Sequence, residues 1–284
     1  MLVDRPWLLT HLNDPDLRLI DCRFDLADPG KGQRDYAEAH LPGAVHLDLD
    51  RDLSGDKRQG GGRHPLPELD YLRERLQVLG IGDRQRIVLY DASRGAFACR
   101  AWWLLRGLGL ESVSLLDGGY PAWVAAGLPT TAAVPTHPPA TLTPRPDFRQ
   151  LDQAALKHRK QEADVVLIDA READRYRGER EPIDPVAGHI PGAIVRPWTE
   201  ATTPEGFWRS PAEQRQRWAD LSAARERICY CGSGVTACVN LFSLALAGLD
   251  GTLYPGSWSD WCSDPANPVA TGSEAWSGAA DPAP

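Results

Sequence analysis

Cys231 is the residue whose surroundings point most directly to chemistry. The apolar run Ile228–Tyr230 leads into it, and the small residues Gly232–Gly234 lead out of it into an apolar stretch that begins near Val235. This order predicts a buried strand, a tight turn and a helix. The N–H groups of such a turn, together with the positive end of the helix dipole, favour a thiolate over a thiol. The pattern is therefore typical of a reactive cysteine.

An inert, buried cysteine is the alternative interpretation of the same pattern. Strand–glycine–helix turns are common in α/β proteins, and a free cysteine packs well in a core. For Cys238, which lies about one helical turn past the loop, core packing is favoured over a role as redox partner of Cys231.

The charge of the chain argues against whole classes of ligand. Its 284 residues carry a formal net charge of -8, so we expect no general attraction to nucleic acid or to an anionic membrane. No apolar run reaches the roughly 18 residues that a membrane span needs. Residues Met1–Pro6 lack the basic and apolar regions of a secretion signal. The sequence predicts a cytoplasmic protein.

The cysteines predict neither a disulfide framework nor a metal site. Six cysteines are spread over the chain, and a reducing compartment would keep them as thiols. Cys229 and Cys231 are too close together for a zinc knuckle. No dinucleotide or phosphate-binding motif stands at a strand–helix junction, so we expect no metal and no organic cofactor.

Two halves of the sequence are related to each other. Leu19–Arg23 is followed by Ala39–Ala44, and Leu167–Arg171 is followed by the similar Gly188–Ala193. The aspartates of the first pair lie 169 − 21 = 148 positions apart, and the histidines of the second pair lie 189 − 40 = 149 apart. Each half alternates short apolar runs with helical patterns, which predicts an α/β fold in which each half forms a mostly parallel sheet flanked by helices.

A proline-rich stretch over residues 129–147 separates the halves and predicts an extended linker. We therefore expect an N-terminal domain over 1–128, a C-terminal domain over 148–270 and a loosely held tail over 271–284. Where the second half has Cys231, the first has Asp91. Only the second half can host thiolate chemistry.

These features resemble the tandem-domain rhodanese family of sulfurtransferases. The resemblance covers nearly the whole chain, through the paired Asp-x-Arg and His-x-Pro-Gly-Ala segments, Leu115–Gly119, Pro255–Trp258 and the Cys231 loop. It implies two rhodanese-like domains, of which the N-terminal one is non-catalytic and the C-terminal one catalytic.

Within the family, the loop Cys231–Ala237 resembles that of the 3-mercaptopyruvate sulfurtransferases. The thiosulfate branch usually has Arg and Lys directly after the cysteine, where this chain has Gly232 and Ser233. A loop without those cations is poorly equipped to hold a dianion, whereas a monocarboxylate can be held by arginines elsewhere. The resemblance therefore favours 3-mercaptopyruvate as the sulfur donor and leaves thiosulfate as the alternative.

The resemblance also implies that Cys231 is the nucleophile and carries the transferred sulfur as a persulfide. Backbone N–H groups of the loop would stabilise the sulfur anion. The loop positions expected to contact the substrate sulfur are Gly232, Gly234, Val235 and Thr236.

A proton donor is needed because breaking the C–S bond of 3-mercaptopyruvate leaves an enolate. Ser233 and His64 match the serine and the histidine that serve this need in the family. For the acid that completes the set, Asp56 fits best and Asp52 is the competing choice.

An arginine is expected to hold the carboxylate of the donor. Arg175 matches a substrate-binding arginine of the family, but the second such arginine, nine positions later, is replaced by Asp184. Arg180 and Arg177 are the candidates to reach the same place.

A cysteine phosphatase and a non-catalytic persulfide carrier are the alternatives to a sulfurtransferase. A cysteine phosphatase needs Cys-x5-Arg, but here the sixth residue after the cysteine is Ala237. A non-catalytic persulfide carrier with a protein partner is still open. The sequence does not distinguish among cyanide, a small thiol and thioredoxin as the sulfur acceptor.

Overall fold

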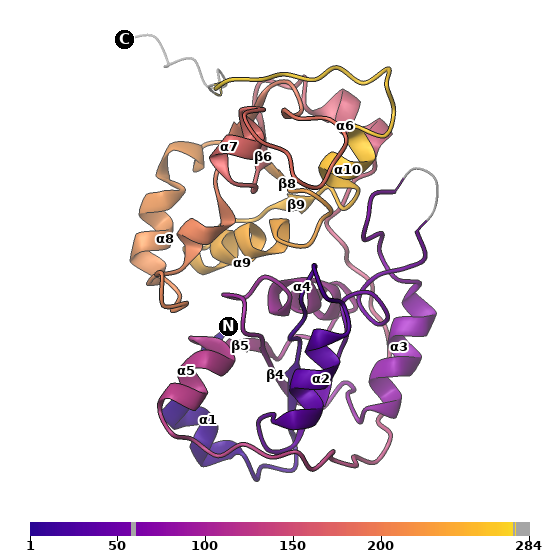
Figure 1. The fold of residues 1–284 in the computed structure, drawn as a ribbon, viewed down its shortest axis with the longest axis vertical. Coiled ribbons are helices and arrows are strands. Elements are labelled where there is room, and N and C mark those ends of the chain that lie inside the picture. The colour runs from indigo at the N-terminus through magenta and orange to yellow at the C-terminus, as the bar shows by residue number, and fades with distance from the viewer. Residues whose placement is uncertain (58–60, 275, 277–284) are drawn as a thin grey trace. The chain divides into compact units, whose positions relative to one another are not determined.

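The computed structural model describes residues 1–57, 61–274 and 276, and these form two compact units (Figure 1). The first unit is made of Met1–Gly55, Leu66–Phe148 and Thr202–Trp208. The second is made of Asp56–Pro65, Arg149–Ala201 and the chain from Arg209 onward. Each half of the sequence therefore contributes a short segment to the unit that is built mainly from the other half.

A parallel sheet forms the centre of the first unit. In spatial order its strands are β1 (Leu2–Val3), β5 (Val113–Leu116), β4 (Arg86–Tyr90), β2 (Leu17–Asp21) and β3 (Ala44–His46). Each neighbouring pair runs parallel. The central strands β2 and β4 are almost entirely buried, which explains their mainly apolar sequences.

The second unit repeats this design with a shorter sheet. Its strands, in spatial order, are β7 (Ala193–Val195), β6 (Val165–Asp169), β8 (Glu226–Tyr230) and β9 (Thr252–Leu253), again all parallel. Asp169 of β6 lies opposite Tyr230 of β8, as Asp21 lies opposite Tyr90 in the first unit. The residues directly after β4 and β8, Asp91 and Cys231, are therefore structurally equivalent.

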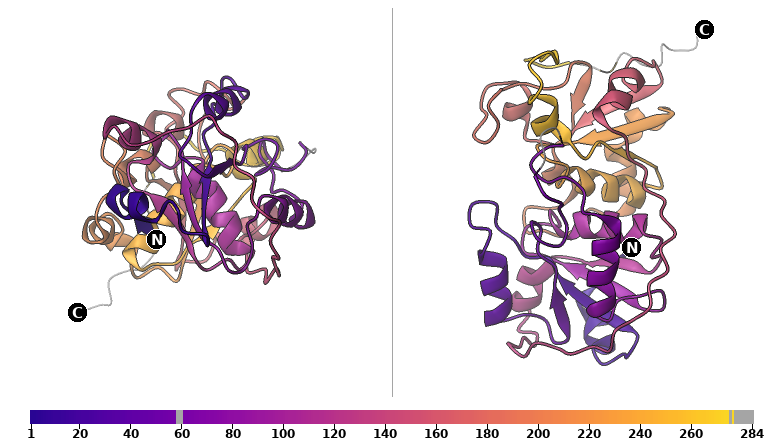
Figure 2. Two further views of the ribbon diagram at one scale, coloured as in Figure 1. Left: turned by 90° about the horizontal axis from the view of Figure 1, so that it is seen from below. Right: turned by 90° about the vertical axis from the view of Figure 1, so that its right-hand side faces the viewer.

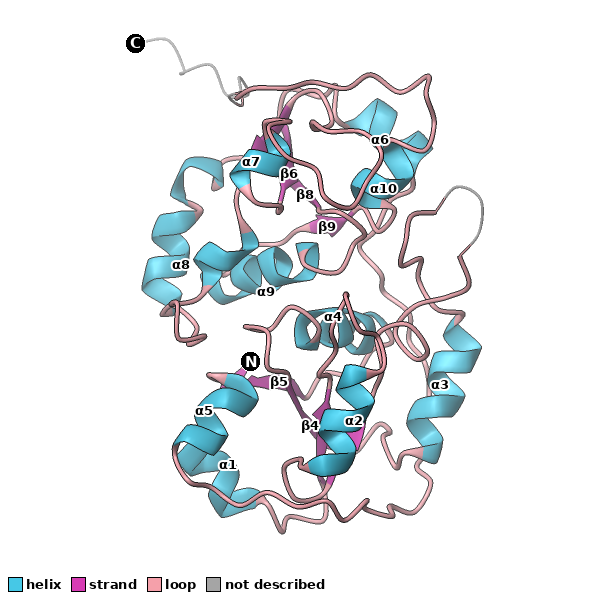
Figure 3. Cartoon of the chain, in the orientation of Figure 1, coloured by secondary structure: helices cyan, strands magenta, loops and turns pink. Residues whose placement is uncertain are grey.

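Helices pack around each sheet (Figures 2 and 3). Those of the first unit are α1 (Arg5–His11), α2 (Lys31–Glu38), α3 (Leu69–Val78), α4 (Ala98–Gly107) and α5 (Gly119–Ala125). Those of the second are α6 (Gln153–Arg159), α7 (Ala173–Tyr176), α8 (Pro211–Arg217), α9 (Ala237–Ala247) and α10 (Ser257–Trp261), with 3-10 turns η1 (Trp198–Ala201) and η2 (Ala219–Leu221). The predicted α/β fold class, with parallel sheets flanked by helices, is confirmed.

Each unit has its own apolar core. In the first, Trp123 is fully buried in a cluster that includes Leu8 of α1 and Val88 of β4. In the second, Trp258 and Trp261 of α10 are fully buried. Because each sheet packs its own helices, each unit positions its own central loop.

The repeated Asp-x-Arg and His-x-Pro-Gly segments are tied together inside each unit. The Arg171 guanidinium bonds the Asp169 carboxylate at 2.6 Å and the carbonyl of Gly188 at 2.7 Å. Arg23 makes the same pair of contacts with Asp21 and Ala39 in the first unit. These buried motifs anchor the loop before β7 or β3 to the central strand, which is a structural role.

The proline-rich stretch over 129–147 has no helix or strand, apart from a single bridge between Thr131 and His40 (Figure 3). It runs along the first unit, where the N–H groups of Arg145 and Asp147 donate to the end of α4. Of the tail predicted over 271–284, residues 275 and 277–284 lie outside the described part of the chain. Within the described residues, no helix is long and apolar enough to cross a membrane.

Candidate active site

Cys231 lies at the carboxyl end of β8, between that strand and α9. Its N–H donates to Ser257 Oγ at 3.1 Å, and its carbonyl accepts the N–H of Trp258 at 2.9 Å. The start of α10 therefore holds the cysteine backbone in place. The residue is buried, with only 2% of its surface exposed.

Gly234 gives this loop its tight curve. Its φ is +75°, and a Cβ atom added there would lie 2.3 Å from the carbonyl oxygen of Pro255. Only glycine fits such a conformation and such a contact. The loop therefore packs against Pro255, and it is also tied to α10, since the Ser259 N–H donates to the carbonyl of Gly232 at 2.9 Å.

The loop offers backbone N–H groups to an anion. Among the described residues, no acceptor is found for the N–H groups of Gly232, Ser233, Val235 and Thr236. Thr236 is the N-cap of α9, so the last of these groups belongs to the positive end of that helix. Such a concave set of donors is suited to a sulfur anion.

The equivalent loop of the first unit has its donors filled. The Asp91 carboxylate accepts four backbone N–H groups at 2.8 to 2.9 Å, those of Ser93, Gly95, Phe97 and Ala98. Burial raises the pKa of Asp91, and the four N–H donors oppose this shift. In the first unit, the Asp91 carboxylate thus accepts hydrogen bonds from loop N–H groups. In the second unit, the corresponding loop keeps such N–H groups available to a bound anion.

His64 and Ser233 come together in the second unit. His64 Nδ1 lies 2.7 Å from Ser233 Oγ, and both side chains are buried. The segment that carries His64 is held by its neighbours: the Arg63 N–H donates to Ser259 Oγ at 3.1 Å, and Gly62 packs against the carbonyl of Gly256. The imidazole of His64 therefore lies against the hydroxyl of Ser233, the residue two positions after the cysteine.

The two candidates for the acid, Asp56 and Asp52, lie in different surroundings. The Asp56 side chain is exposed and bonds neither His64 nor Ser233 within the described residues. Asp52, the competing choice, is buried in the first unit, where its carboxylate bonds Arg75 at 3.0 Å and the N–H of Asp48 at 2.8 Å. Both assignments remain predictions from the resemblance.

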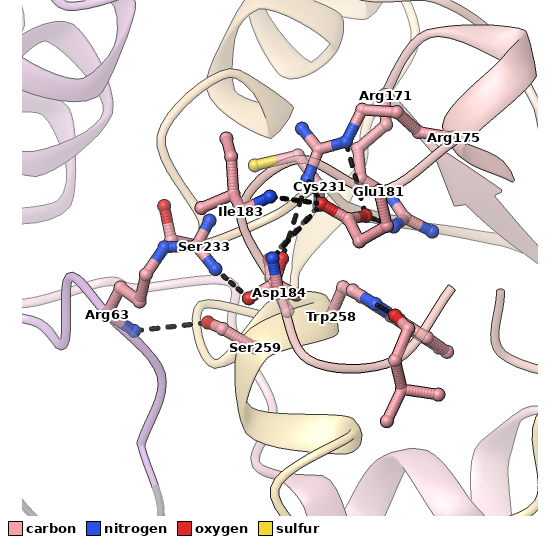
Figure 4. A network of polar contacts seen from close by, with 12 residues as sticks. Arg63, Arg171, Arg175, Glu181, Ile183, Asp184, Cys231, Ser233, Trp258 and Ser259 are labelled. Atoms are coloured by element: carbon pink, nitrogen blue, oxygen red, sulfur yellow. Dashed lines mark hydrogen bonds and ion pairs between the residues drawn. The ribbon is translucent and has the colours of Figure 1, made fainter. Parts of the chain in front are cut away.

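Arg175 lies beside the cysteine loop. A Cβ atom added to Gly232 would lie 3.7 Å from Arg175 Nη2. The guanidinium bonds Glu181 Oε1 at 2.6 Å and Asp184 Oδ2 at 3.4 Å (Figure 4). Arg175 is therefore a cation on the face of the loop, and its charge is balanced by two carboxylates.

The two arginines that were candidates for the second position do not reach the loop. Arg180 is exposed and bonds Asp174 at 2.6 Å, and Arg177 bonds the exposed Glu179 at 2.7 Å. Both sit in surface ion pairs, which explains why neither is drawn toward the cysteine.

Arg63 is the cation that sequence reasoning missed. Its Nη2 would lie 2.8 Å from a Cβ atom on Gly232, and its Nη1 bonds Asp184 Oδ1 (Figure 4). Burial lowers the pKa of Arg63, while the nearby Cys231 sulfur raises it. Its position directly before His64 was a usable signal, because the segment that delivers the histidine necessarily delivers its neighbour.

The other conspicuous residues have structural surroundings. Burial raises the pKa of the Cys229 thiol to about 12. The Cys238 thiol donates to the Gly234 carbonyl at 3.5 Å, which pins the loop to α9. His189 Nδ1 lies 2.8 Å from the carbonyl oxygen of Tyr176. Within the described residues, no group of three or more His, Cys, Asp or Glu side chains could hold a metal ion.

Known proteins are similar to this chain over most of its length. A family model described as the rhodanese-like domain matches residues 4–126 and again residues 152–264. A probable 3-mercaptopyruvate sulfurtransferase of Pseudomonas aeruginosa is 49% identical over 272 residues, which cover 93% of this chain and 96% of the relative. SseB of Mycobacterium tuberculosis, provisionally named a thiosulfate sulfurtransferase, is 38% identical over 93% of this chain and 94% of its own length.

A solved structure is similar over nearly the same span. SseA from Escherichia coli, described among the 3-mercaptopyruvate sulfotransferases, matches with a TM-score of 0.77 and 32% identity. The match covers 91% of this chain and 98% of that one. Both halves of the chain are therefore included in each similarity.

Proposed function

Because this chain belongs to the rhodanese family, with two rhodanese-like domains in tandem, we propose that it is a sulfurtransferase that takes sulfur from 3-mercaptopyruvate. The sulfur passes through a persulfide on Cys231 in the second domain. The observation that carries the choice of donor is the 2.7 Å contact between His64 Nδ1 and Ser233 Oγ, two positions after the cysteine. A proton-transfer pair is useful with 3-mercaptopyruvate, because loss of its sulfur leaves an enolate that must be protonated. Thiosulfate leaves no carbanion, so it needs no such pair.

The first step is attack of the Cys231 thiolate on the donor sulfur. The new S–S bond forms as the C–S bond of the donor breaks, and the electron pair of that bond goes to carbon as an enolate. The open N–H groups of the loop donate hydrogen bonds to the negatively charged sulfur of the persulfide. This stabilisation lowers the barrier because the donors are already in place before the charge develops.

The enolate then needs a proton on carbon to leave as pyruvate. Ser233 Oγ is the proposed donor, with His64 relaying the proton that the thiol of the donor gives up. The step is balanced, since thiolate and mercaptopyruvate become persulfide anion and pyruvate. An imidazole is suited to this relay because its ordinary pKa lies near neutrality.

In the second step an acceptor attacks the outer sulfur of the persulfide. The S–S bond breaks, and its electron pair returns to Cys231 as a thiolate. Cyanide, a small thiol and thioredoxin are all proposed acceptors, because each supplies a nucleophile. We propose a cytoplasmic location, where a reducing environment keeps the six thiols of the chain free.

Thiosulfate is the second candidate donor. The similarity to SseB favours it, as do two cations, Arg63 and Arg175, against Gly232. These arginines would supply the charge that the loop itself lacks. The sulfur-transfer rates with 3-mercaptopyruvate and with thiosulfate therefore distinguish the two candidates.

The deciding experiment measures initial sulfur-transfer rates with each donor at equal concentration and with cyanide as the common acceptor. We expect a preference for 3-mercaptopyruvate that is lost in Cys231→Ser and kept in Cys262→Ser, which removes a thiol outside the loop. A preference for thiosulfate would refute the proposed donor. A stable persulfide without turnover on either donor would favour a carrier with a protein partner.

A further inference from the structure

On the face of the cysteine loop, the buried carboxylate of Asp184 holds no backbone group in place. Asp184 is buried, with its side chain 3% exposed, although its neighbours Ile183 and Val186 are 50% and 36% exposed. Within the described residues, the Asp184 carboxylate bonds only two groups. One oxygen meets Arg63 Nη1, and the other lies 3.4 Å from Arg175 Nη2 (Figure 4).

Glu181, the other carboxylate on this loop, has a different role. Its oxygens bond Arg171 at 3.1 Å and Arg175 at 2.6 Å, and one of them also accepts the N–H groups of Ile183 and Asp184 at 3.1 Å. Glu181 therefore shapes the backbone that carries Asp184. Replacing Glu181 would remove two hydrogen bonds to the backbone of this turn, whereas Asp184 can leave its two partners without breaking a backbone contact made by its carboxylate.

The two guanidiniums that Asp184 bridges both face the residue after the nucleophile. Their Nη2 atoms would lie 2.8 Å (Arg63) and 3.7 Å (Arg175) from a Cβ atom on Gly232. A carboxylate held between them is therefore next to Cys231. Asp184 is such a carboxylate, and it belongs to the protein.

We propose that Arg63 and Arg175 form the fork that binds the carboxylate of the sulfur donor, and that Asp184 occupies this fork until the donor displaces it. The inference rests on the proposed function for the identity of the donor. Exchange of one carboxylate for another leaves the charge of the buried fork unchanged, so neither arginine is stripped of a counter-ion. The exposed flanks of Asp184 allow its loop to move outward.

Arg63 is then a specificity-determining residue, and Asp184 is an internal competitor. Loss of Arg63 removes a charge-assisted hydrogen bond to the donor carboxylate, which should weaken binding by about ten- to a hundred-fold. Loss of the negative charge on Asp184 should strengthen binding of the donor carboxylate, because the two arginines then no longer hold an anion of the protein. We expect affinity to rise by about ten-fold in Asp184→Asn.

Calorimetric titration with pyruvate tests the fork without any sulfur transfer, because pyruvate has the carboxylate of the donor but no sulfur. The variants are Arg63→Met and Asp184→Asn. Arg63→Lys, which keeps the charge but not the fork, covers the case in which the methionine variant fails to fold. The matched control is Arg225→Met, since Arg225 bonds Asp164 at 2.7 Å in an exposed ion pair of the same unit.

The expected results are weaker pyruvate binding in both Arg63 variants, tighter binding in Asp184→Asn and no change in Arg225→Met. Unchanged affinity in the Arg63 variants would overturn the fork. Weaker binding in Asp184→Asn would overturn the competitor role, because Asp184 would then be positioning Arg63. A wild-type chain that binds pyruvate in this pattern but transfers no sulfur would refute the proposed function and still support the fork.

Discussion

The imidazole of His64 lies within 2.7 Å of the hydroxyl of Ser233, although 169 positions separate the two residues in the chain. The pair forms because residues 61–65 come from the first half of the sequence but pack in the second unit. Gly62 and Arg63 anchor that segment next to α10, and the same helix holds the backbone of Cys231. Helix α10 thus holds both the segment that carries His64 and the backbone of the proposed nucleophile.

Removal of either member of this pair should impair transfer from 3-mercaptopyruvate. We expect His64→Ala and Ser233→Ala each to lower kcat by about 10²- to 10⁴-fold, the usual contribution of general acid catalysis. Because the two groups act as a unit, the double variant should lose little more than the worse single variant. Steady-state rates with both donors provide the measurement.

Transfer from thiosulfate should be nearly unaffected, because that donor leaves no carbanion to protonate. His158→Ala is the matched control, since this histidine is exposed on α6 of the same unit. Equal losses with the two donors would mean that the pair maintains the loop and does not supply a proton.

Cys229 and Cys231 should behave differently although only one residue separates them. Burial raises the pKa of Cys229 to about 12. A group with that pKa is ionised at pH 8 to only about one part in ten thousand, so it cannot act as a nucleophile there. Incubation with the donor should therefore add one sulfur atom to Cys229→Ala, as to the wild type, and none to Cys231→Ser. Intact-protein mass spectrometry distinguishes the variants, and loss of the added sulfur in Cys229→Ala would contradict the assignment.

Gly234 should tolerate no side chain. Alanine at a φ of +75° carries a backbone cost, and its Cβ would clash with Pro255, so we expect Gly234→Ala to lower the free energy of unfolding by about 2 to 5 kcal/mol. Gly248 at the end of α9 is the control, because its φ is +80° and nothing lies within 4 Å of an added Cβ.

Gly248→Ala should cost only the backbone term of about 1 kcal/mol and keep full activity. Thermal unfolding followed by circular dichroism, together with transfer rates below the melting temperature, compares the two variants. Equal destabilisation by both substitutions would show that the clash with Pro255 adds nothing to the cost of Gly234→Ala.

Asp91 should be needed for folding and not for catalysis. Asp91→Asn keeps the shape of the side chain but turns an amide N–H group toward backbone donors that the carboxylate now satisfies. We expect a loss of about 3 kcal/mol in the free energy of unfolding. Urea unfolding measures this loss, and the transfer rate per folded molecule should stay at the wild-type value. A large fall in that rate would mean that the first loop takes part in the reaction.

The sequence by itself determined the family, the α/β class and the position of the cysteine. Its two repeats each contain a buried aspartate–arginine pair and an apolar central strand, and these local patterns depend on neighbours close in the chain. The difference between Asp91 and Cys231 was equally visible, because it is a matter of residue type. The roles of Ser233, His64 and Arg175 came from the resemblance and stay predictions.

Only the tertiary structure decided which charges meet around the loop. Arg63 reaches Asp184 across 121 positions, and no periodicity or spacing reports such a contact. The candidates Arg180 and Arg177 were near in sequence but found carboxylates at the surface, where an ion pair costs less desolvation than one beside the cysteine. Long-range pairing of charges depends on how segments pack, and that packing is a property of the folded chain as a whole.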